Sequence, residues 1–145
     1  MVLDDVFEIA RIEKICFLQD PWNVHALKVS VTNPYGYCLT AQIENKIVGY
    51  LIGTEGDGAG HLMNLAVSPQ YRRKGIGSAL LGNWIDRGRR LVWNKSTLEV
   101  RQSNFEAIKL YEKFGYKYLK TNNHYYLNGE DGIVMIRAFE CAVQE

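Results

Sequence analysis

Residues 67–81 read Val-Ser-Pro-Gln-Tyr-Arg-Arg-Lys-Gly-Ile-Gly-Ser-Ala-Leu-Leu. This order predicts the end of a strand, a turn with three cations and two glycines, and then an amphipathic helix. The first turn of a helix has N–H groups without intrahelical partners and partial positive charge, so it can hold an anion. Gly75 and Gly77 would let that anion approach the backbone closely. We therefore predict a phosphate-binding turn.

Two common nucleotide motifs do not fit this turn. A Rossmann dinucleotide site needs the third glycine of GxGxxG and a later acidic strand end, whereas this helix continues with the apolar Trp84 and Ile85. A P-loop needs Gly-Lys followed by Ser or Thr four residues after a first glycine, and that pattern is missing. A plain basic turn with flexible glycines is the simpler alternative, but it leaves the strand-turn-helix order unexplained.

Composition limits the class of protein. The length of 145 residues is that of one ordinary domain, so we expect a single domain over residues 1–145. The 17 Lys and Arg residues balance 16 acidic residues, and a nucleic-acid partner would need a basic excess. Cys16, Cys38 and Cys141 are odd in number and widely separated, so we expect reduced, buried thiols and no metal site.

The N-terminal residues point to a cytoplasmic protein. Acidic residues stand near the N-terminus, where a secretory signal peptide would be apolar. No stretch approaches the roughly 20 apolar residues that a membrane span needs. We therefore expect a cytoplasmic location and no membrane partner.

Periodicity and turn residues divide the chain into helices and strands. Helical spacing predicts helices over about 6–15, 24–31, 75–90 and 104–114. Shorter apolar or alternating runs predict strands over about 37–43, 47–54, 61–68, 96–100, 116–120 and 133–138, with residues 55–60 as a flexible connection. The resulting order predicts an α/β (α+β) fold, in which helices pack on the faces of a mixed sheet.

Two stretches resemble the GNAT superfamily of acetyl-CoA-dependent N-acetyltransferases. Residues 72–77, Arg-Arg-Lys-Gly-Ile-Gly, are similar to the family signature R/Q-x-x-G-x-G/A. Residues 98–116, which begin Leu-Glu-Val-Arg-Gln-Ser-Asn, resemble the ribosomal-protein alanine acetyltransferases and their N-terminal acetyltransferase relatives. With further similarity at 16–22 and 125–131, the resemblance covers almost the whole chain.

The resemblance implies the GNAT fold, with a mostly antiparallel central sheet and helices on both faces. Members of the family begin with a strand before the first helix. Here helix-like sequence starts almost at Met1. We therefore expect that first strand to be short or missing.

The resemblance also implies acetyl-CoA as the acyl donor. Its pyrophosphate would lie on the backbone amides of residues 73–78, and the backbone N–H of Val67, at a bulged strand end, would contact the acyl carbonyl. Asn104 either contacts the coenzyme or caps the following helix, and both readings stay open. The expected coenzyme contacts are Leu65, Val67, Arg72, Arg73, Lys74, Gly75, Gly77, Ser78, Asn104 and Tyr111.

By the same resemblance, the acceptor amine attacks the thioester directly, without an acyl-enzyme. Glu99 matches the family's proposed general base, and a surface pair with Arg101 is the structural alternative. Tyr111 matches the general acid that protonates the leaving sulfur, although a core tyrosine with a satisfied hydroxyl is the common alternative. His61 is a second candidate base that would act through water, against a purely structural role.

Aromatic residues near both ends of the chain match those that enclose the first residue of the acceptor peptide in N-terminal acetyltransferases. They are Pro21, Trp22, Tyr125 and Tyr126, and hydrophobic packing under a loop is the alternative. The implied function is acetylation of protein N-termini, ribosomal proteins included, by a monomer or weak homodimer. Acetylation of lysine side chains, polyamines or other small amines stays open, as does an acyl-CoA-binding sensor without turnover.

Overall fold

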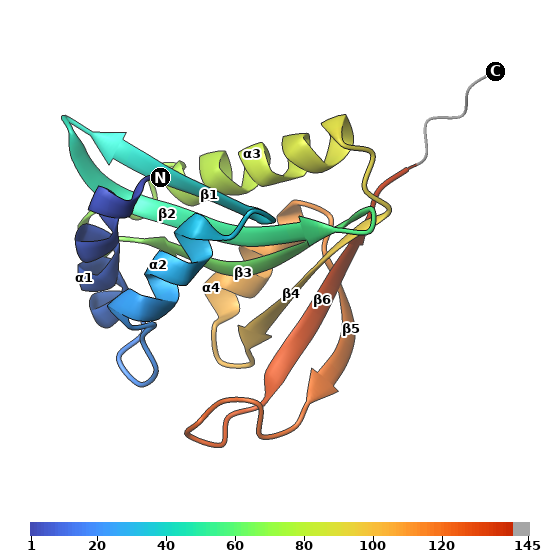
Figure 1. Cartoon of the computed structure of the whole chain (residues 1–145). Helices are drawn as coiled ribbons and strands as arrows, with labels where there is room; N and C mark the ends of the chain where they lie inside the picture. Colours follow the sequence, from blue (N-terminus) through green and yellow to red (C-terminus); the bar gives the residue numbers. More distant parts are fainter. Residues whose placement is uncertain (141–145) are drawn as a thin grey trace. The chain divides into compact units, whose positions relative to one another are not determined.

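Four α-helices and six β-strands make up residues 1–140, the part of the chain that the computed structural model describes (Figure 1). Short 3-10 turns precede α1 and α3, at Leu3–Asp5 and Pro69–Tyr71. The elements follow the predicted order closely. They are α1 (Val6–Cys16), α2 (Val24–Thr32), β1 (Gly36–Ile43), β2 (Lys46–Gly56), β3 (Ala59–Val67), α3 (Ile76–Arg90), β4 (Lys95–Arg101), α4 (Phe105–Lys113), β5 (Lys117–Asn122) and β6 (Gly132–Ala138).

The strands form one six-stranded sheet in the order β1-β2-β3-β4-β6-β5. The pairs β1–β2, β4–β6 and β5–β6 are antiparallel, whereas β3 and β4 are parallel. The predicted mixed, mostly antiparallel sheet is therefore confirmed. Among the described residues, the first element is the 3-10 turn directly before α1.

The connection between β2 and β3 differs from the prediction. A flexible segment over residues 55–60 was expected, but β2 runs to Gly56 and β3 begins at Ala59. Asp57 and Gly58 have φ values of 54° and 73°, so both adopt the left-handed conformation of a two-residue hairpin turn. The backbone N–H of Asn94 donates to the Gly58 carbonyl at 2.6 Å. The turn is therefore short and held in place.

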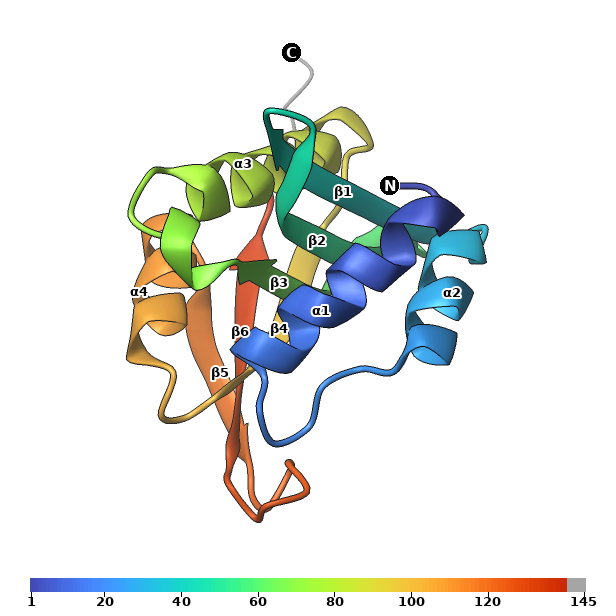
Figure 2. The same cartoon turned by 90° about the vertical axis from the view of Figure 1, so that its left-hand side faces the viewer.

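The chain divides into two units, and the first comprises residues 1–54 and 63–81. In it α1 and α2 lie against β1 and β2, as both views show (Figures 1 and 2). The Asn23 side chain caps α2 by accepting a hydrogen bond from the Ala26 N–H at 2.8 Å. The core of this unit is formed by Val6, Ile9, Ile12, Leu27, Ile47, Tyr50, Ile52 and Ala66.

Helices cover both faces of β2 within this unit. The Tyr50 side chain contacts Glu13 of α1. A Cβ at the neighbouring Gly49 would lie 3.4 Å from side-chain atoms of Ile76 and Leu80 in α3. Because successive strand residues point to opposite faces, α1 and the start of α3 lie on opposite sides of the strand. The predicted helices on both faces are confirmed here.

The second unit contains the rest of the described residues, and β4 organises it. Ser96 is buried, accepts a hydrogen bond from Trp84 Nε1 at 3.0 Å, and its hydroxyl lies 2.7 Å from that of Tyr116. Alternation leaves Thr97 and Glu99 half-buried on the other face of the strand. That face carries the polar residues described below.

Three features of residues 1–140 concern membrane-spanning helices, metal-binding clusters and disulfides. None of their helices is long and apolar enough to cross a membrane. Within this range, no cluster of three or more His, Cys, Asp or Glu side chains could hold a metal ion. Cys16 and Cys38 are half-buried free thiols, and Cys141 lies outside the described residues.

Candidate active site

The predicted phosphate-binding turn links the end of β3 to the start of α3. Residues 72–75 are exposed to solvent. Arg73 and Gly75 have φ values of 61° and 79°, so the backbone reverses through two left-handed residues. A Cβ at Gly75 would meet no atom within 4 Å, which leaves the turn open on that side. The turn can therefore be reached by a ligand.

Backbone donors converge on this turn. The N–H of Ala79 donates to the Gly75 carbonyl at 2.9 Å, which is the first i to i−4 bond of α3. The N–H groups of residues 76–78 precede that bond and have no carbonyl partner in the helix. Residue 78 is a serine, whose hydroxyl is a further donor, and Lys74 precedes these residues in the turn. Such groups can hold a diphosphate, and binding of the coenzyme pyrophosphate here stays a prediction.

Arg72 has contacts that the sequence did not indicate. Its Nε donates to the Val67 carbonyl at 3.0 Å, and its Nη2 lies 3.4 Å from Cys16 Sγ. The guanidinium therefore ties the turn to the end of β3, next to the residue expected to contact the acyl carbonyl. Leu65 and Val67 are both half-buried. The bulge expected at Val67, and contact of Arg72 with the coenzyme, stay predictions.

The two candidate bases are hydrogen-bonded to each other. His61 of β3 stands opposite Thr97 in the parallel pairing with β4. The imidazole Nδ1 lies 2.9 Å from Thr97 Oγ1, and Nε2 lies 2.9 Å from Glu99 Oε2. The His61 and Glu99 side chains are 37% and 24% exposed, so solvent reaches both.

Hydrogen-bonding chemistry assigns directions to these contacts. An ionised carboxylate only accepts, so Nε2 of His61 donates to Glu99, and a neutral imidazole then accepts from the Thr97 hydroxyl at Nδ1. Among the described residues, none donates a hydrogen bond to the second oxygen of Glu99. Arg101, the surface partner considered for Glu99, pairs with Glu130 instead. Glu99 is therefore the member of the pair with an oxygen open to a further donor.

Tyr111 of α4 is only 7% exposed, and its ring packs edge-on against Tyr116 with centroids 5.8 Å apart. Within residues 1–140, no group forms a hydrogen bond with its hydroxyl. Burial raises the pKa of Tyr111 well above its ordinary value of 10.0, so the hydroxyl is protonated at neutral pH. A protonated hydroxyl is what a proton donor needs, and the general-acid role of Tyr111 stays a prediction.

Asn104 caps α4. Its Oδ1 accepts a hydrogen bond from the Ala107 N–H at 3.2 Å, which is the N-cap contact. The helix-capping reading of Asn104 is therefore confirmed. The cap uses the oxygen alone, so the Nδ2 group can still donate elsewhere, and its contact with the coenzyme stays a prediction.

The segment between α1 and α2 carries Pro21 and Trp22, both half-buried. The Trp22 side chain packs against the hydrophobic core of the first unit. Its backbone N–H donates to Glu13 Oε2 at 2.9 Å. Hydrophobic packing thus accounts for part of the Trp22 side chain, and acceptor contact stays a prediction for both residues.

Glu13 was missed by the sequence reasoning. It is fully buried in α1, and besides the Trp22 N–H its carboxylate accepts from the Tyr50 hydroxyl and Asn64 Nδ2. Burial raises the pKa of Glu13 in spite of these donors. Glu13 therefore joins α1, β2, β3 and the Trp22 segment. Its signal was a carboxylate four residues after Ile9, on the apolar face of the predicted helix.

Tyr125 and Tyr126 lie between β5 and β6, in a segment that projects from the ends of these strands (Figure 1). Their rings pack edge-on with centroids 4.9 Å apart, and Tyr125 is 50% exposed. Partial burial and the charge of Glu99 raise the pKa of Tyr125. Glu99 and Tyr125 therefore interact electrostatically within the second unit.

The candidate residues divide between the two units. The phosphate-binding turn, Val67 and Trp22 belong to the first unit, and Glu99 and Tyr111 belong to the second. Sequence similarity connects the sets, because it extends through both units.

Residues 3–116 match the family described as the acetyltransferase (GNAT) family. The chain belongs to this family. GNAT enzymes take their acetyl group from acetyl-CoA, so the chain is an acetyl-CoA-dependent N-acetyltransferase, as the two quoted motifs predicted. The turn before α3 is open to solvent, and its binding of the coenzyme pyrophosphate stays a prediction.

Individual acetyltransferases are similar to this chain in sequence and in fold. An N-alpha-acetyltransferase of Sulfurisphaera tokodaii is 33% identical over 147 residues, which cover 92% of this chain and 87% of the relative. The crystal structure of the ribosomal-protein-S18-alanine N-acetyltransferase from Escherichia coli superposes with a TM-score of 0.84 at 26% identity, covering 99% of this chain and 92% of that one. Ard1 from Thermoplasma volcanium has a TM-score of 0.89 at 23% identity, with coverage of 97% and 95%, and shares the fold.

Proposed function

We propose that this acetyltransferase acetylates the α-amine of protein N-termini. The observation that carries the proposal is the Glu99 carboxylate, which is held by His61, keeps one oxygen open and raises the pKa of Tyr125 in the neighbouring loop. The similarity to relatives named for N-alpha and ribosomal-protein alanine acetylation supports the same acceptor. Ribosomal proteins are accordingly among the candidate acceptors.

An α-amine suits a single carboxylate base. Its reference pKa is about 8, against about 10.4 for lysine, so its deprotonation at neutral pH costs roughly 3 kcal/mol less. A carboxylate base achieves the smaller of these tasks more readily. The proposal therefore favours α-amines over lysine side chains and polyamines.

We assign the base role to Glu99 and a positioning role to His61. Both ring nitrogens of His61 are engaged, by Thr97 and by Glu99, so neither faces an incoming amine while these bonds hold. The open oxygen of Glu99 can accept the amine proton directly or through one water. His61 and Thr97 then fix the orientation of the carboxylate. This assignment decides between the two candidate bases.

When bound, acetyl-CoA supplies an activated acetyl thioester. The N–H groups of residues 76–78, with Arg73, Lys74 and Ser78, would hold its pyrophosphate, and the backbone near Leu65 and Val67 would face its acyl end. As the amine nitrogen bonds to the acetyl carbon and the carbon–sulfur bond breaks, Glu99 takes the amine proton. Tyr111 gives its hydroxyl proton to the departing sulfur.

Aromatic residues from both units are the candidate contacts of the acceptor. Pro21, Trp22, Tyr125 and Tyr126 would contact the first residues of the acceptor peptide. We propose that both units act as one catalytic domain, since the family match crosses both. A cytoplasmic monomer or weak homodimer completes the proposal.

Acetylation of a peptide library with varied N-terminal residues tests this function. We expect mass spectrometry to place the acetyl group on the α-nitrogen, with a preference among first residues. Acetylation mainly at lysine Nζ, or faster acetylation of spermidine than of any peptide, would replace the proposal with a lysine or small-amine acceptor.

A further inference from the structure

Arg101 follows Glu99 on the same face of β4. Alternation buries Leu98 and Val100 and leaves Thr97, Glu99 and Arg101 half-buried on the other face. Two residues of strand separate the backbones of Glu99 and Arg101 by roughly 7 Å. A group fixed by Arg101 is therefore held close to the candidate base.

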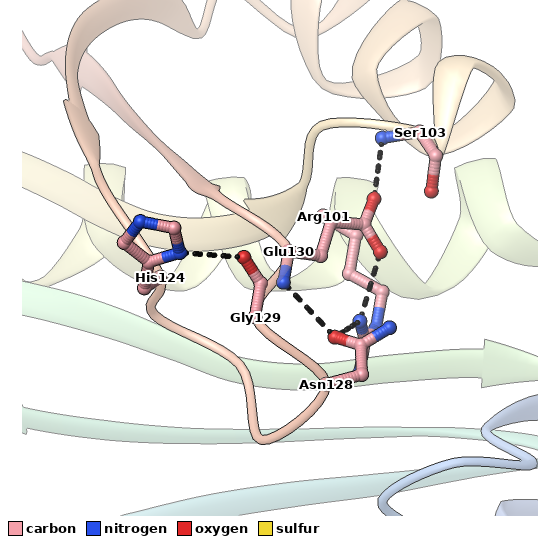
Figure 3. A network of polar contacts seen from close by, with 6 residues as sticks. All are labelled: Arg101, Ser103, His124, Asn128, Gly129 and Glu130. Carbon is pink, nitrogen blue, oxygen red and sulfur yellow. Dashed lines mark hydrogen bonds and ion pairs between the residues drawn. The ribbon is translucent and has the colours of Figure 1, made fainter.

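Arg101 contacts three residues of the segment 124–131, here called the acceptor loop. Its Nη1 donates to Glu130 Oε2 at 2.9 Å and to Asn128 Oδ1 at 3.0 Å, contacts that Figure 3 shows converging from the strand and the loop. Its guanidinium lies over the Tyr126 ring, 4.0 Å from the centroid. Guanidinium suits this combination because it is planar, always charged and able to stack.

Glu130 contacts both Arg101 and the backbone of Ser103. Its second oxygen accepts the backbone N–H of Ser103 at 2.9 Å, so the carboxylate bridges β4 and the turn that follows it (Figure 3). Hydrogen bonds with Ser103 and the nearby Arg101 lower the pKa of Glu130, which keeps it ionised at neutral pH. The side chains of the pair are only 17% and 22% exposed, so solvent screens it less than an exposed pair.

The acceptor loop has internal bonds of its own. The Tyr126 N–H donates to the Glu130 carbonyl at 3.1 Å, and the Gly129 N–H donates to the Tyr126 carbonyl at 2.9 Å. The His124 ring is bonded to the Gly129 carbonyl through Nδ1 at 3.0 Å (Figure 3). These bonds shape the loop, whereas the Arg101 contacts attach its side chains to β4.

Tyr126 links Arg101 to Tyr125 through ring contacts. Arg101 lies over Tyr126, and Tyr126 packs edge-on against Tyr125. Tyr125 also covers Gly132, where an added Cβ would lie 3.0 Å from atoms of the tyrosine side chain. Tyr125 therefore contacts both Tyr126 and the start of β6, with half of its surface exposed.

We propose that the Arg101–Glu130 pair is a latch that sets the position of Tyr125 beside Glu99, and that Arg101 is a positioning residue for the acceptor. This inference rests on the proposed function, because it names the part of the protein that fixes acceptor affinity. The contacts of the latch described above join the acceptor loop, β4 and the turn after β4. Its loss therefore weakens acceptor binding without weakening binding of acetyl-CoA.

Steady-state kinetics of Arg101→Gln, Arg101→Lys and Glu130→Gln test the latch. For the two glutamine variants we expect the acceptor KM to rise about tenfold, because each loses a charge-assisted bond, with kcat and the acetyl-CoA KM nearly unchanged. Arg101→Lys keeps the charge but loses the planar fork, so its acceptor KM should be intermediate. Arg89→Gln is the matched control, because it removes a cation from an exposed pair with Asp86.

Hydrogen exchange of the Tyr126 and Gly129 amides provides a readout without turnover. Faster exchange together with a higher acceptor KM supports the latch. Unchanged exchange overturns the latch itself, and faster exchange with an unchanged acceptor KM overturns its positioning role. If the wild type acetylates lysine or a small amine instead of N-termini, the proposed function fails, and the acceptor KM is measured with that amine.

Discussion

His61 Nε2 and Glu99 Oε2 lie 2.9 Å apart, although their residues come from different strands. The parallel register of β3 on β4 sets Thr97 opposite His61, and Thr97 Oγ1 holds the other ring nitrogen at 2.9 Å. One oxygen of Glu99 is thereby fixed and the other is left open. The two side chains therefore have different expected roles, and substitutions should separate them.

Glu99→Gln should lower kcat/KM by about a hundredfold or more, because general base catalysis is lost. His61→Asn should lower it less, about tenfold, because the carboxylate stays but loses its orientation. The Glu99→Gln defect should be largest at low pH, where little of the acceptor amine is already neutral. Rate profiles against pH for both variants check this. A larger loss for His61→Asn than for Glu99→Gln would move the base role to the imidazole.

Tyr111→Phe should lower kcat by about a hundredfold and leave both Michaelis constants nearly unchanged, because only the proton for the leaving sulfur is removed. Tyr116→Phe is the matched control, since that hydroxyl bonds to Ser96. It should lower the free energy of unfolding by about 1 kcal/mol and leave kcat unchanged. Equal kcat for Tyr111→Phe and the wild type, with chemistry rate-limiting, would make Tyr111 a core residue only.

Gly77→Trp should weaken acetyl-CoA binding at least about tenfold, or ~1.4 kcal/mol, because the indole blocks approach to the amides of the first turn of α3. Asn83→Trp places the same indole at an exposed position further along α3, and this variant should bind acetyl-CoA normally. Isothermal titration calorimetry measures both. Undiminished affinity in Gly77→Trp would remove the pyrophosphate from this turn.

Glu13 should make stability depend on pH. Burial raises its pKa above the ordinary 4.5, so the folded protein binds this proton more tightly than the unfolded chain does. The resulting stabilisation is complete below pH 4.5 and is lost as the pH rises toward the raised value. The unfolding free energy of the wild type relative to Glu13→Gln should therefore fall as the pH rises above 4.5.

Denaturant unfolding at several pH values measures that difference, and Glu8→Gln is its control. Glu8 is an exposed residue of the same helix, paired with Arg11, and its difference from the wild type should stay nearly constant. A wild-type advantage over Glu13→Gln that rises with pH would mean that the three donors outweigh burial at this carboxylate.

Local sequence signals predicted most of the fold. Apolar spacing located every helix and strand, and Pro69 and Gly115 marked ends correctly, because such signals act over one or two turns of chain. The prediction of a flexible β2–β3 connection was wrong, because glycines also occur in tight, ordered turns. Asp57-Gly58 is a sequence typical of a two-residue hairpin turn, so this signal was available.

Partners across the chain were harder to predict. Nothing local pairs Arg101 with Glu130, 29 residues later, and so the alternative partner Glu99 was considered instead. His61 and Glu99 were rival bases until the register of β3 on β4 joined them. Register depends on the whole sheet, and a one-residue slip would turn each side chain to the other face.

A comparison of two matched peptides tests whether the acceptor is an α-amine. The same peptide is offered with a free N-terminus and no lysine, and with a blocked N-terminus and one lysine, and kcat/KM is measured for both at neutral pH. We expect kcat/KM to be at least about a hundredfold higher for the peptide with the free N-terminus, since the α-amine is the easier group to deprotonate. Equal values, or a preference for the blocked lysine peptide, would contradict it.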